Sequence, residues 1–405
     1  MRNWFTLLFT ALVVLTQANQ NRKVLLIGID GTRSDAFQQA NTPNIDGLLA
    51  NATYTYDAWH TCITWSGPSW SSILTGVNWN KHGVTDNNFT GSQFATYPPI
   101  ATLAKQIKPG IKASIVAEWD PLIDDITSAS WDRAIKVPDG ETFPTADSAV
   151  AQLQDTGIDF LFAYFDHVDL TGHTTTFSPS NPFYIKAIEQ VDTAVGTILT
   201  ALHNRPDYAN EDWLVMVITD HGGTSFFHGG NSNEERHIWW IASGSAVAHQ
   251  QMAGQDPGTY NCSSNNVFTP SCVDVAKLKA TPSQNDIAVT AVHHLIYDSG
   301  INPETKPEWN LDGKSWLLGA NSIAEASAEE MAIYPNPANY SVKIAVSNPQ
   351  NVKLFDMLGR EVQAKPFTLN DGAVYMDVST LPNGNYIVQA QVEGQLRVSK
   401  LIVMH

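Results

Sequence analysis

The chain has 405 residues, of which 43% are hydrophobic and 16% are charged, a composition typical of folded proteins with more than one domain. Its formal net charge is −17, and its Lys and Arg residues form no cluster along the sequence. Because nucleic-acid backbones are bound by clustered cations, this charge argues against nucleic acid as a structural partner.

Residues 1–18 have the layout of a secretory signal peptide. Arg2 precedes the apolar run WFTLLFTALVVLT, and the small residue Ala18 follows as a cleavage position. A membrane anchor is the alternative, although the run is shorter than the ~20 residues needed to cross a bilayer. No later segment of the sequence would span one. We therefore expect a secreted protein with no transmembrane segment in the mature chain.

Residues 19–317 alternate between predicted strands and helices. Residues 184–203 carry apolar residues at spacings of three and four, as an amphipathic helix does. Four apolar runs end in an acid and suit strands buried on both faces of a parallel sheet: KVLLIGID, ASIVAEWD, DFLFAYFD and WLVMVITD. The pattern predicts an α/β domain with a doubly wound, mostly parallel sheet.

The four runs end at Asp30, Asp120, Asp166 and Asp220. Ligands of open α/β sheets bind at the carboxyl ends of the strands, so we expect these acids to crowd one rim. A single acid at such a place is usually a helix cap or a turn residue. Four on one edge repel each other unless they are spread out, protonated or neutralised by cations.

The remaining chain changes character. Residues 318–332 are small, polar and acidic and are predicted to form a linker. Residues 333–405 alternate apolar and polar positions between Asn, Pro and Gly turns, which predicts a small all-β sandwich.

Four motifs of this C-terminal part resemble the type IX secretion system sorting domain of Gram-negative bacteria: YPNP (334–337), DMLGREV (356–362), LPNGNYIV (381–388) and KLIV (400–403). The resemblance implies passage through the periplasm to the outer-membrane surface or the medium, with the type IX secretion machinery as partner. A carbohydrate-binding or spacer β-module is the alternative. Export would expose Cys262 and Cys272, which flank a polar loop, to conditions that permit a disulfide, and Cys62 is expected as a buried thiol.

Carboxylates and histidines recur at the predicted strand ends. Asp220 and His221 are adjacent, Asp169 and His173 lie four residues apart, and Asp30 follows the first strand. Carboxylate oxygens and imidazoles together suit a divalent ion such as Zn²⁺. Each motif alone also fits a turn or a surface, so their order along the chain carries the argument.

That order is a strand-terminal Asp, a hydroxyl at a helix start, Asp-x-x-Gly-His, Asp-His-Gly and a further His. It resembles the alkaline phosphatase superfamily over about residues 23–245, especially its type I phosphodiesterase/nucleotide pyrophosphatase and phosphoglycerate-mutase-like branches. The resemblance implies two divalent ions, with Zn expected and Mn as the alternative.

The resemblance also implies a ligand set. Asp30, Asp220, His221 and the nucleophile would hold one ion; Asp169, His173 and a later histidine would hold the other. We expect that histidine to be His228, because Gly229 and Gly230 leave room around it. His237, His293 and His294 are the alternatives, and Asp166 and His167 are assigned to supporting positions at the strand end.

The predicted nucleophile is Ser66, counted back from Thr75-Gly76 by the spacing of the family. Pro68 is expected to start a helix there, and Thr64 and Ser69 are the competing hydroxyls. Ser66 as a helix cap only is a further alternative. Asn87, or Asn88 in its place, matches an asparagine that hydrogen-bonds a nonbridging phosphate oxygen in the phosphodiesterase branch.

The expected activity is hydrolysis of phosphate monoesters or diesters through a phosphoseryl intermediate on Ser66. A sulfatase is the nearest rival, because residues 66–70 resemble its Cys/Ser-x-Pro-x-Arg signature, with Trp70 in place of the Arg. A catalytically silent surface binding protein is the third reading. The substrate, a small anionic ester, is left open. Five aromatic residues could line its pocket, although aromatic residues near a strand edge more often belong to the core: Trp65, Trp70, Trp79, Phe89 and Trp119.

Overall fold

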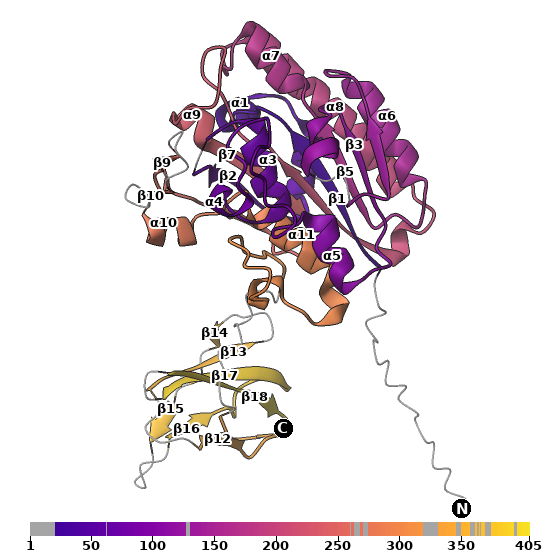
Figure 1. Ribbon diagram of the computed structural model, residues 1–405. Coiled ribbons are helices and arrows are strands. Elements are labelled where there is room, and N and C mark those ends of the chain that lie inside the picture. Colours follow the sequence, from indigo (N-terminus) through magenta and orange to yellow (C-terminus); the bar gives the residue numbers. More distant parts are fainter. Residues whose placement is uncertain are drawn as a thin grey trace, which may run out of the picture. The chain divides into compact units, whose positions relative to one another are not determined.

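The chain divides into two compact units, Met1–Ser322 and Ile323–His405 (Figure 1). The computed structural model describes residues 21–61, 63–126, 130–259, 261–262, 268–269, 274–318, 331–345, 350–356, 361–362, 364, 366–368, 374–392 and 395–405. The predicted signal peptide, most of the predicted linker, Cys62 and Cys272 lie outside the described residues, and so does the proposed disulfide.

An eight-stranded sheet forms the centre of the first unit, in the order β4-β3-β5-β1-β6-β7-β2-β8. Among these strands only β7 runs against the others, because it pairs in antiparallel fashion with both β6 and β2. The strands are β1 (Asn21–Ile29), β2 (Ala52–Trp59), β3 (Ala113–Ala117), β4 (Arg133–Lys136), β5 (Phe160–Phe165), β6 (Glu211–Ile218), β7 (His237–Ser243) and β8 (Gln250–Met252). The predicted doubly wound, mostly parallel α/β fold is confirmed.

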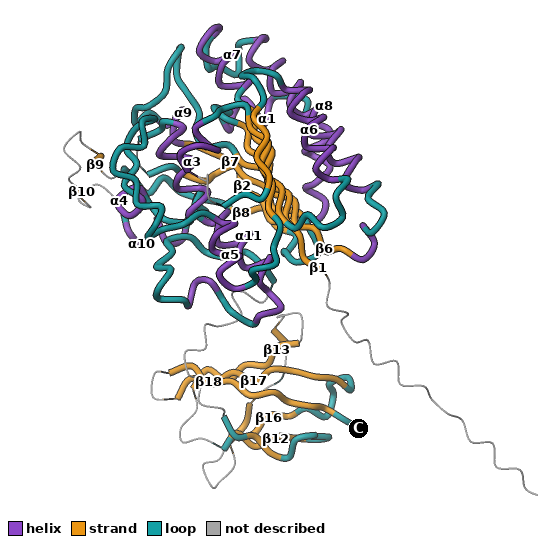
Figure 2. The backbone as a smooth tube through the Cα atoms, turned by 45° about the vertical axis from the view of Figure 1, so that its right-hand side comes forward, coloured by secondary structure: helices purple, strands orange, loops and turns teal. Residues whose placement is uncertain are grey.

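Helices cover both faces of this sheet, which lies between two helical layers (Figure 2). Alternate residues of β1 explain the two layers: Val24 and Leu26 enter one core, and Leu25 and Ile27 enter the other. The first core is closed by α3 (Ser66–Thr75), α5 (Ile100–Ile107) and α11 (Asp286–Ile296). The second is closed by α1 (Ser34–Gln39), α6 (Thr142–Leu153), α7 (His167–Thr175) and α8 (Pro182–His203).

The remaining described elements of this unit are short. The α-helices are α2 (Pro43–Asp46), α4 (Trp79–His82), α9 (Asn233–Arg236) and α10 (Val275–Ala280), and a two-stranded ribbon pairs β9 (Asn261–Cys262) with β10 (Phe268–Thr269). Across the described ranges, no helix combines the length and hydropathy that a membrane crossing requires.

The carboxyl ends of the central strands are level, since Ile29 of β1 pairs with Phe165 of β5 and Gly28 pairs with Ile218 of β6. Asp30, Asp166 and Asp220 therefore follow the strands at one rim, as predicted. The third run behaves differently. Strand β3 ends at Ala117, and the next residue, Glu118, is buried. Asp120 lies at the surface, where it pairs with Lys136 at 3.2 Å. The expectation that Asp120 joins the acidic rim was wrong.

The second unit is an all-β sandwich, as predicted. One sheet has the order β11-β12-β16-β15 and the other β14-β13-β17-β18. Val342 and Met376 of the first sheet share a core with Val388 and Leu401 of the second. The strands are β11 (Ile333–Tyr334), β12 (Ser341–Ile344), β13 (Gln350–Asp356), β14 (Glu361–Val362), β15 (Pro366–Thr368), β16 (Val374–Asp377), β17 (Gly384–Val392) and β18 (Gln395–Val403).

Two of the sequence motifs meet in this sandwich. The side chain of Asn336, from YPNP, donates to the Lys400 carbonyl at 2.7 Å and accepts from the Ile402 amide at 2.8 Å, both within KLIV. The Asn336 side chain thus makes the two backbone hydrogen bonds that a neighbouring strand would make at the end of β18.

Candidate active site

Asp30, Asp220 and His221 lie together, fully buried, at the carboxyl ends of β1 and β6. His221 Nε2 is 3.4 Å from Asp30 Oδ1 and 3.2 Å from Asp220 Oδ2. The other oxygen of Asp30 accepts hydrogen bonds from the Tyr164 hydroxyl at 2.6 Å and the Trp70 indole at 2.8 Å. These two donors fix the carboxylate, so that Oδ1 faces the histidine.

Burial dominates the protonation of this group. It raises the pKa of Asp30 to about 6, although the hydrogen bonds from Tyr164 and Trp70 lower it. It also raises the pKa of Asp220 well above its ordinary value and lowers the pKa of His221 to about 4. Two buried carboxylates beside a neutral imidazole are stabilised in their charged form by a cation.

Ser66 is the first residue of α3, two residues earlier than the Pro68 start predicted from the sequence. Its Oγ lies 3.4 Å from Asp30 Oδ1 and 3.3 Å from His221 Nε2. The amino terminus of a helix favours anions, because its amides and its dipole point toward them. The serine hydroxyl therefore stands between the acidic group and a place suited to an anionic substrate.

The competing hydroxyls have other partners. Thr64 Oγ1 accepts from the Gly229 amide at 2.9 Å and donates to the Gly230 carbonyl at 3.2 Å. Ser69 Oγ donates to the Trp65 carbonyl at 2.7 Å and lies 2.9 Å from His60 Nε2. Among the described residues, neither hydroxyl is hydrogen-bonded to the acidic group around Asp30.

A second cluster adjoins the first. Helix α7 places Asp169 and His173 one turn apart, with 3.3 Å between Asp169 Oδ2 and His173 Nε2. His228 Nε2 is 3.0 Å from His173 Nε2 and 3.6 Å from Asp169 Oδ1. The rings of His228 and His221 stack at 3.9 Å, so the two clusters are continuous.

The glycine of the Asp-x-x-Gly-His motif, Gly172, is required by packing. Gly172 is helical, and a Cβ there would lie 2.4 Å from the Phe177 ring. The glycine therefore makes room for this ring. At Gly229, by contrast, φ is +102° and the Trp65 ring occupies the place of a side chain, so this position requires glycine.

The donor atoms fit a pair of adjacent divalent ions. His173, His221 and His228 each place Nδ1 within 2.8 Å of a backbone carbonyl oxygen, an arrangement in which Nδ1 carries the hydrogen and Nε2 keeps its lone pair. Asp169 Oδ1 and Asp220 Oδ2 are buried, and neither has a hydrogen-bond donor among the described residues. Two sets of ligand atoms lie within 4.8 Å of one another: Asp30, Asp220 and His221, and Asp169, His221 and His228.

The other candidate histidines lie elsewhere. His237 Nε2 is 3.0 Å from Asp57 Oδ1, His293 Nδ1 is 2.8 Å from Ser315 Oγ, and His294 Nε2 donates to the Asp212 carbonyl at 2.8 Å. None of the three belongs to either set of ligand atoms in the described chain. His228 is the later histidine that the fold brings to Asp169.

Glu118 is a residue that the sequence analysis missed. It is fully buried, its Oε2 accepts from the Asp166 amide at 2.9 Å, and Asp166 Oδ1 accepts from the Gly140 amide at 2.7 Å. Burial raises the pKa of Glu118 to about 9. Asp166 precedes α7, so this carboxyl supports the start of the helix that carries Asp169. His167, the other supporting candidate, lies 3.2 Å from Gln190.

The residues expected to contact substrate differ in exposure. Asn87 Oδ1 accepts from the Gly67 amide at 2.8 Å, beside Ser66, whereas the Asn88 amide caps an exposed turn with Asp86. Trp65 is 39% exposed. Trp70, Trp79 and Phe89 are buried in the core, and Trp119 packs on Phe89 at 5.9 Å. Of the two alternatives for these aromatic residues, Trp70, Trp79 and Phe89 follow the core one, since all three are buried.

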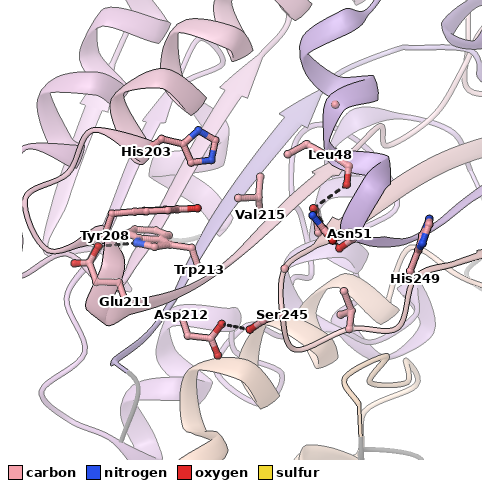
Figure 3. Close-up of a pocket in the computed structure, with 14 residues that line it drawn as sticks. Leu48, Asn51, His203, Tyr208, Glu211, Asp212, Trp213, Val215, Ser245 and His249 are labelled. Carbon is pink, nitrogen blue, oxygen red and sulfur yellow. Dashed lines mark hydrogen bonds between the residues drawn. The ribbon is translucent and has the colours of Figure 1, made fainter. Parts of the chain in front are cut away.

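A large cavity of about 750 Å³ lies at the other end of β6 (Figure 3). Its walls include Glu211, Asp212 and Trp213, the first residues of that strand. Several of its polar groups are satisfied, since Trp213 donates to Glu211 at 2.7 Å and Ser245 donates to Asp212 at 2.7 Å. None of the candidate metal ligands lines this cavity.

The sequence matches two family models. The type I phosphodiesterase/nucleotide pyrophosphatase model matches residues 24–238, which is more than half of the chain, and the secretion system C-terminal sorting domain matches residues 332–404. An uncharacterized pyrophosphatase/phosphodiesterase of Schizosaccharomyces pombe is 25% identical over 257 residues, 56% of this chain and 49% of that protein. Human ectonucleotide pyrophosphatase/phosphodiesterase family member 7 is 23% identical over 233 residues, 52% of this chain and 50% of that protein.

The chain spans about half the length of these curated relatives. Among solved structures, inactive murine ectonucleotide pyrophosphatase/phosphodiesterase 5 in complex with AMP has a TM-score of 0.51 at 15% identity, covering 68% of this chain and 95% of that one. A 2-O GAG sulfatase has a TM-score of 0.52 at 13% identity, covering 88% and 85%. At such identities the likeness shows a shared fold.

Proposed function

The chain belongs to the type I phosphodiesterase/nucleotide pyrophosphatase family, and on this premise we propose that it is an exported hydrolase of phosphate diesters that uses Ser66 as its nucleophile. The observation that carries the proposal is the position of the Ser66 hydroxyl, within 3.4 Å of both Asp30 and His221 at the amino terminus of α3. A hydroxyl surrounded by candidate metal ligands, on a helix start that favours anions, suits attack on phosphorus.

Two divalent ions complete the proposed site. Asp30, Asp220, His221 and Ser66 would hold one, and Asp169, His173 and His228 the other. When bound, such ions lower the pKa of a coordinated hydroxyl and neutralise charge on the transferring phosphoryl group. Zn²⁺ suits this set of imidazoles and carboxylates, and Mn²⁺ is the alternative.

The reaction takes place in two displacements at phosphorus. Ser66 Oγ forms a bond to phosphorus as the bond to the leaving oxygen breaks, which produces a phosphoseryl enzyme and an alcohol. Water then attacks phosphorus, the bond to Ser66 Oγ breaks, and the serine hydroxyl is regenerated. Two inversions give overall retention of configuration at phosphorus.

The charges around Ser66 favour diesters over monoesters. Asn87 accepts the Gly67 amide through its oxygen, which leaves its NH₂ group as a neutral donor for a nonbridging oxygen. Arg33, three residues after Asp30 in the sequence, is already engaged with Asp35. A diester carries one negative charge and a monoester up to two, so a site with neutral donors favours the diester.

Trp70 weighs against a sulfatase. It occupies the place of the signature arginine, yet its ring is fully buried and its indole N–H donates to Asp30. The side chain thus supports a candidate metal ligand and offers no charge to a sulfate ester.

Export is proposed from both ends of the chain. The sorting-domain match at residues 332–404 and the signal-like sequence at residues 1–18 together support passage through the periplasm and the type IX secretion machinery. The final location would be the outer surface or the medium.

A hydrolysis panel tests the proposed activity. Purified protein is assayed with bis-p-nitrophenyl phosphate, p-nitrophenyl phosphate and p-nitrophenyl sulfate, before and after chelation and then with added Zn²⁺ or Mn²⁺. We expect the diester to be cleaved fastest, chelation to stop the reaction and Ser66→Ala to abolish it, while the exposed-serine control Ser180→Ala stays active. Sulfate cleavage above diester cleavage, or full activity of Ser66→Ala, would refute the proposal.

A further inference from the structure

The two oxygens of the Asp30 carboxylate have different surroundings. Oδ2 accepts hydrogen bonds from the Tyr164 hydroxyl at 2.6 Å and from the Trp70 indole at 2.8 Å. Because a carboxylate oxygen has about two lone-pair directions, these two donors occupy both of them. Oδ1 instead lies 3.4 Å from the Ser66 hydroxyl and 3.4 Å from His221 Nε2. Asp30 therefore has one oxygen left to offer to an ion.

The fold holds both donors in place. Tyr164 lies on β5, where it is the register partner of Gly28 on β1. A Cβ at Gly28 would lie 2.5 Å from Cη2 of Trp70, so this glycine lets the indole ring pack directly on β1. The rings of Trp70 and Tyr164 meet edge to face at 5.2 Å, and both are fully buried. Side chains packed in this way have little freedom to turn away from Asp30.

Helix α3 carries residues that contact both oxygens of Asp30. Ser66 and Trp70 lie one turn apart on this helix, with Ser66 near Oδ1 and Trp70 bonded to Oδ2. Asp220 shows a similar division, since its Oδ1 accepts the Gly31 amide at 3.1 Å while its Oδ2 lies 3.2 Å from His221 Nε2. Each of the two carboxylates thus directs one oxygen toward the histidine.

We propose that Tyr164 and Trp70 are positioning residues: by restricting Asp30 to one oxygen, they give the adjoining ion site its preference for Zn²⁺ over Mn²⁺. The inference rests on the proposed two-ion hydrolase. The donor atoms of this site are Asp30 Oδ1, Asp220 Oδ2, His221 Nε2 and Ser66 Oγ. Four is the number of ligands that Zn²⁺ most often takes. An ion that favours about six oxygen ligands, as Mn²⁺ does, would gain from Asp30 Oδ2, which the two donors withhold.

Metal competition on the full chain tests the proposal. Tyr164→Phe is the main variant, because it removes only the hydroxyl that donates to Asp30 Oδ2. Chelated protein is titrated with Zn²⁺, and separately with Mn²⁺, against a chromophoric chelator. We expect the ratio of Zn²⁺ affinity to Mn²⁺ affinity to fall about tenfold or more, since loss of a hydrogen bond to a ligand weakens Zn²⁺ binding and the released oxygen becomes available to Mn²⁺.

The matched control is Tyr386→Phe. It removes the hydroxyl of another buried tyrosine, which donates to the Pro382 carbonyl at 2.8 Å in the sandwich. This variant should keep the native ratio of affinities. A purely structural role of Tyr164 would weaken the binding of both ions alike and would also leave the ratio unchanged.

The visible spectrum of the Co²⁺-loaded chain provides a second measurement, because four-coordinate Co²⁺ absorbs far more strongly than six-coordinate Co²⁺. We expect Tyr164→Phe and Trp70→Phe to absorb less strongly than the native chain, since Asp30 Oδ2 would add a ligand. The other ion contributes alike to all three spectra, so the difference reports the site at Asp30.

The proposal is overturned if both variants keep the native ratio of affinities and the native Co²⁺ spectrum. A native chain that binds neither Zn²⁺ nor Mn²⁺ overturns it as well. If the ratio shifts as expected in a chain that hydrolyses no diester, the result supports the positioning role and refutes the proposed function, so the two failures are distinguishable.

Discussion

The two halves of the candidate metal site are built on different kinds of structure. Asp30, Asp220 and His221 follow central strands, and their side chains are at most 2% exposed. In the other half, Asp169 and His173 lie on α7 and His228 lies on a loop, with His173 37% exposed. We call Asp30, Asp220 and His221 the strand half, and Asp169, His173 and His228 the helix half. The sheet and its two cores hold the strand half in place, whereas the helix half depends on contacts between surface elements. We expect the strand half to govern catalysis and stability, and the helix half to govern how readily an ion is gained or lost.

The largest effect is expected in the strand half. Asp220→Asn removes a buried ligand candidate that lies 3.2 Å from His221. Activity should fall roughly 10³-fold, because a bound metal ion stabilises the transition state by several kcal/mol. The same change should raise the melting temperature of chelated protein, because burial opposes the charge of Asp220. Diester hydrolysis and calorimetry with and without chelator measure both results, with the exposed Asp147→Asn as control. Unchanged activity would remove Asp220 from the site.

A smaller effect is expected in the helix half. His228→Ala should lose about one bound ion per chain and reduce activity roughly 10²-fold, while its metal-depleted form stays folded. His237→Ala is the matched control, because His237 pairs with Asp57 and lies outside both sets of ligand atoms. Metal content by mass spectrometry distinguishes the two. Equal loading of both variants would remove His228 from the proposed site.

The smallest effect concerns the support beneath α7. The pKa of Glu118 is raised from 4.5 to about 9 in the folded chain. The folded state therefore binds a proton that the unfolded state releases above pH 4.5, and this contribution to stability is lost as pH rises through about 9. Glu118→Gln, which mimics the protonated carboxyl, should flatten the fall in melting temperature over this range.

Glu118→Ala serves as the contrasting variant. It removes the acceptor of the Asp166 amide and should lower the melting temperature at every pH, as loss of a buried hydrogen bond does. If thermal scans of Glu118→Gln keep the full pH dependence of the native chain, the buried carboxyl is not its source.

The positions of the ligand candidates in the strand half were easier to predict from sequence than those in the helix half. Asp30 and Asp220 follow long apolar runs, and such runs fix both the direction of a buried parallel strand and the rim where it ends. The same reasoning failed at Asp120, because β3 stops at Ala117, three residues before this acid. The acid that turns inward is Glu118. A shift of two residues at a strand end exchanged a buried carboxyl for a surface one.

The helix half required tertiary information. The spacing of Asp169 and His173 indicates one helix face, but four histidines remained open as their partner. The choice of His228 depends on a loop whose path is set by contacts with distant residues. Thr64 shows the same limit, since its hydroxyl suggested a nucleophile from sequence alone and is instead bonded to Gly229 and Gly230.

Thr64 also connects the two halves of the candidate metal site, because it contacts His228 and lies two residues before Ser66. Its carbonyl lies 2.7 Å from His228 Nδ1, and Ser66 begins α3 two residues later. A relative that changes the length of the loop around His228 would therefore have to change the approach to its nucleophile as well. Enzyme engineers who wish to transplant the 228–235 loop between members of this family should move residues 64–66 with it, as a single cassette.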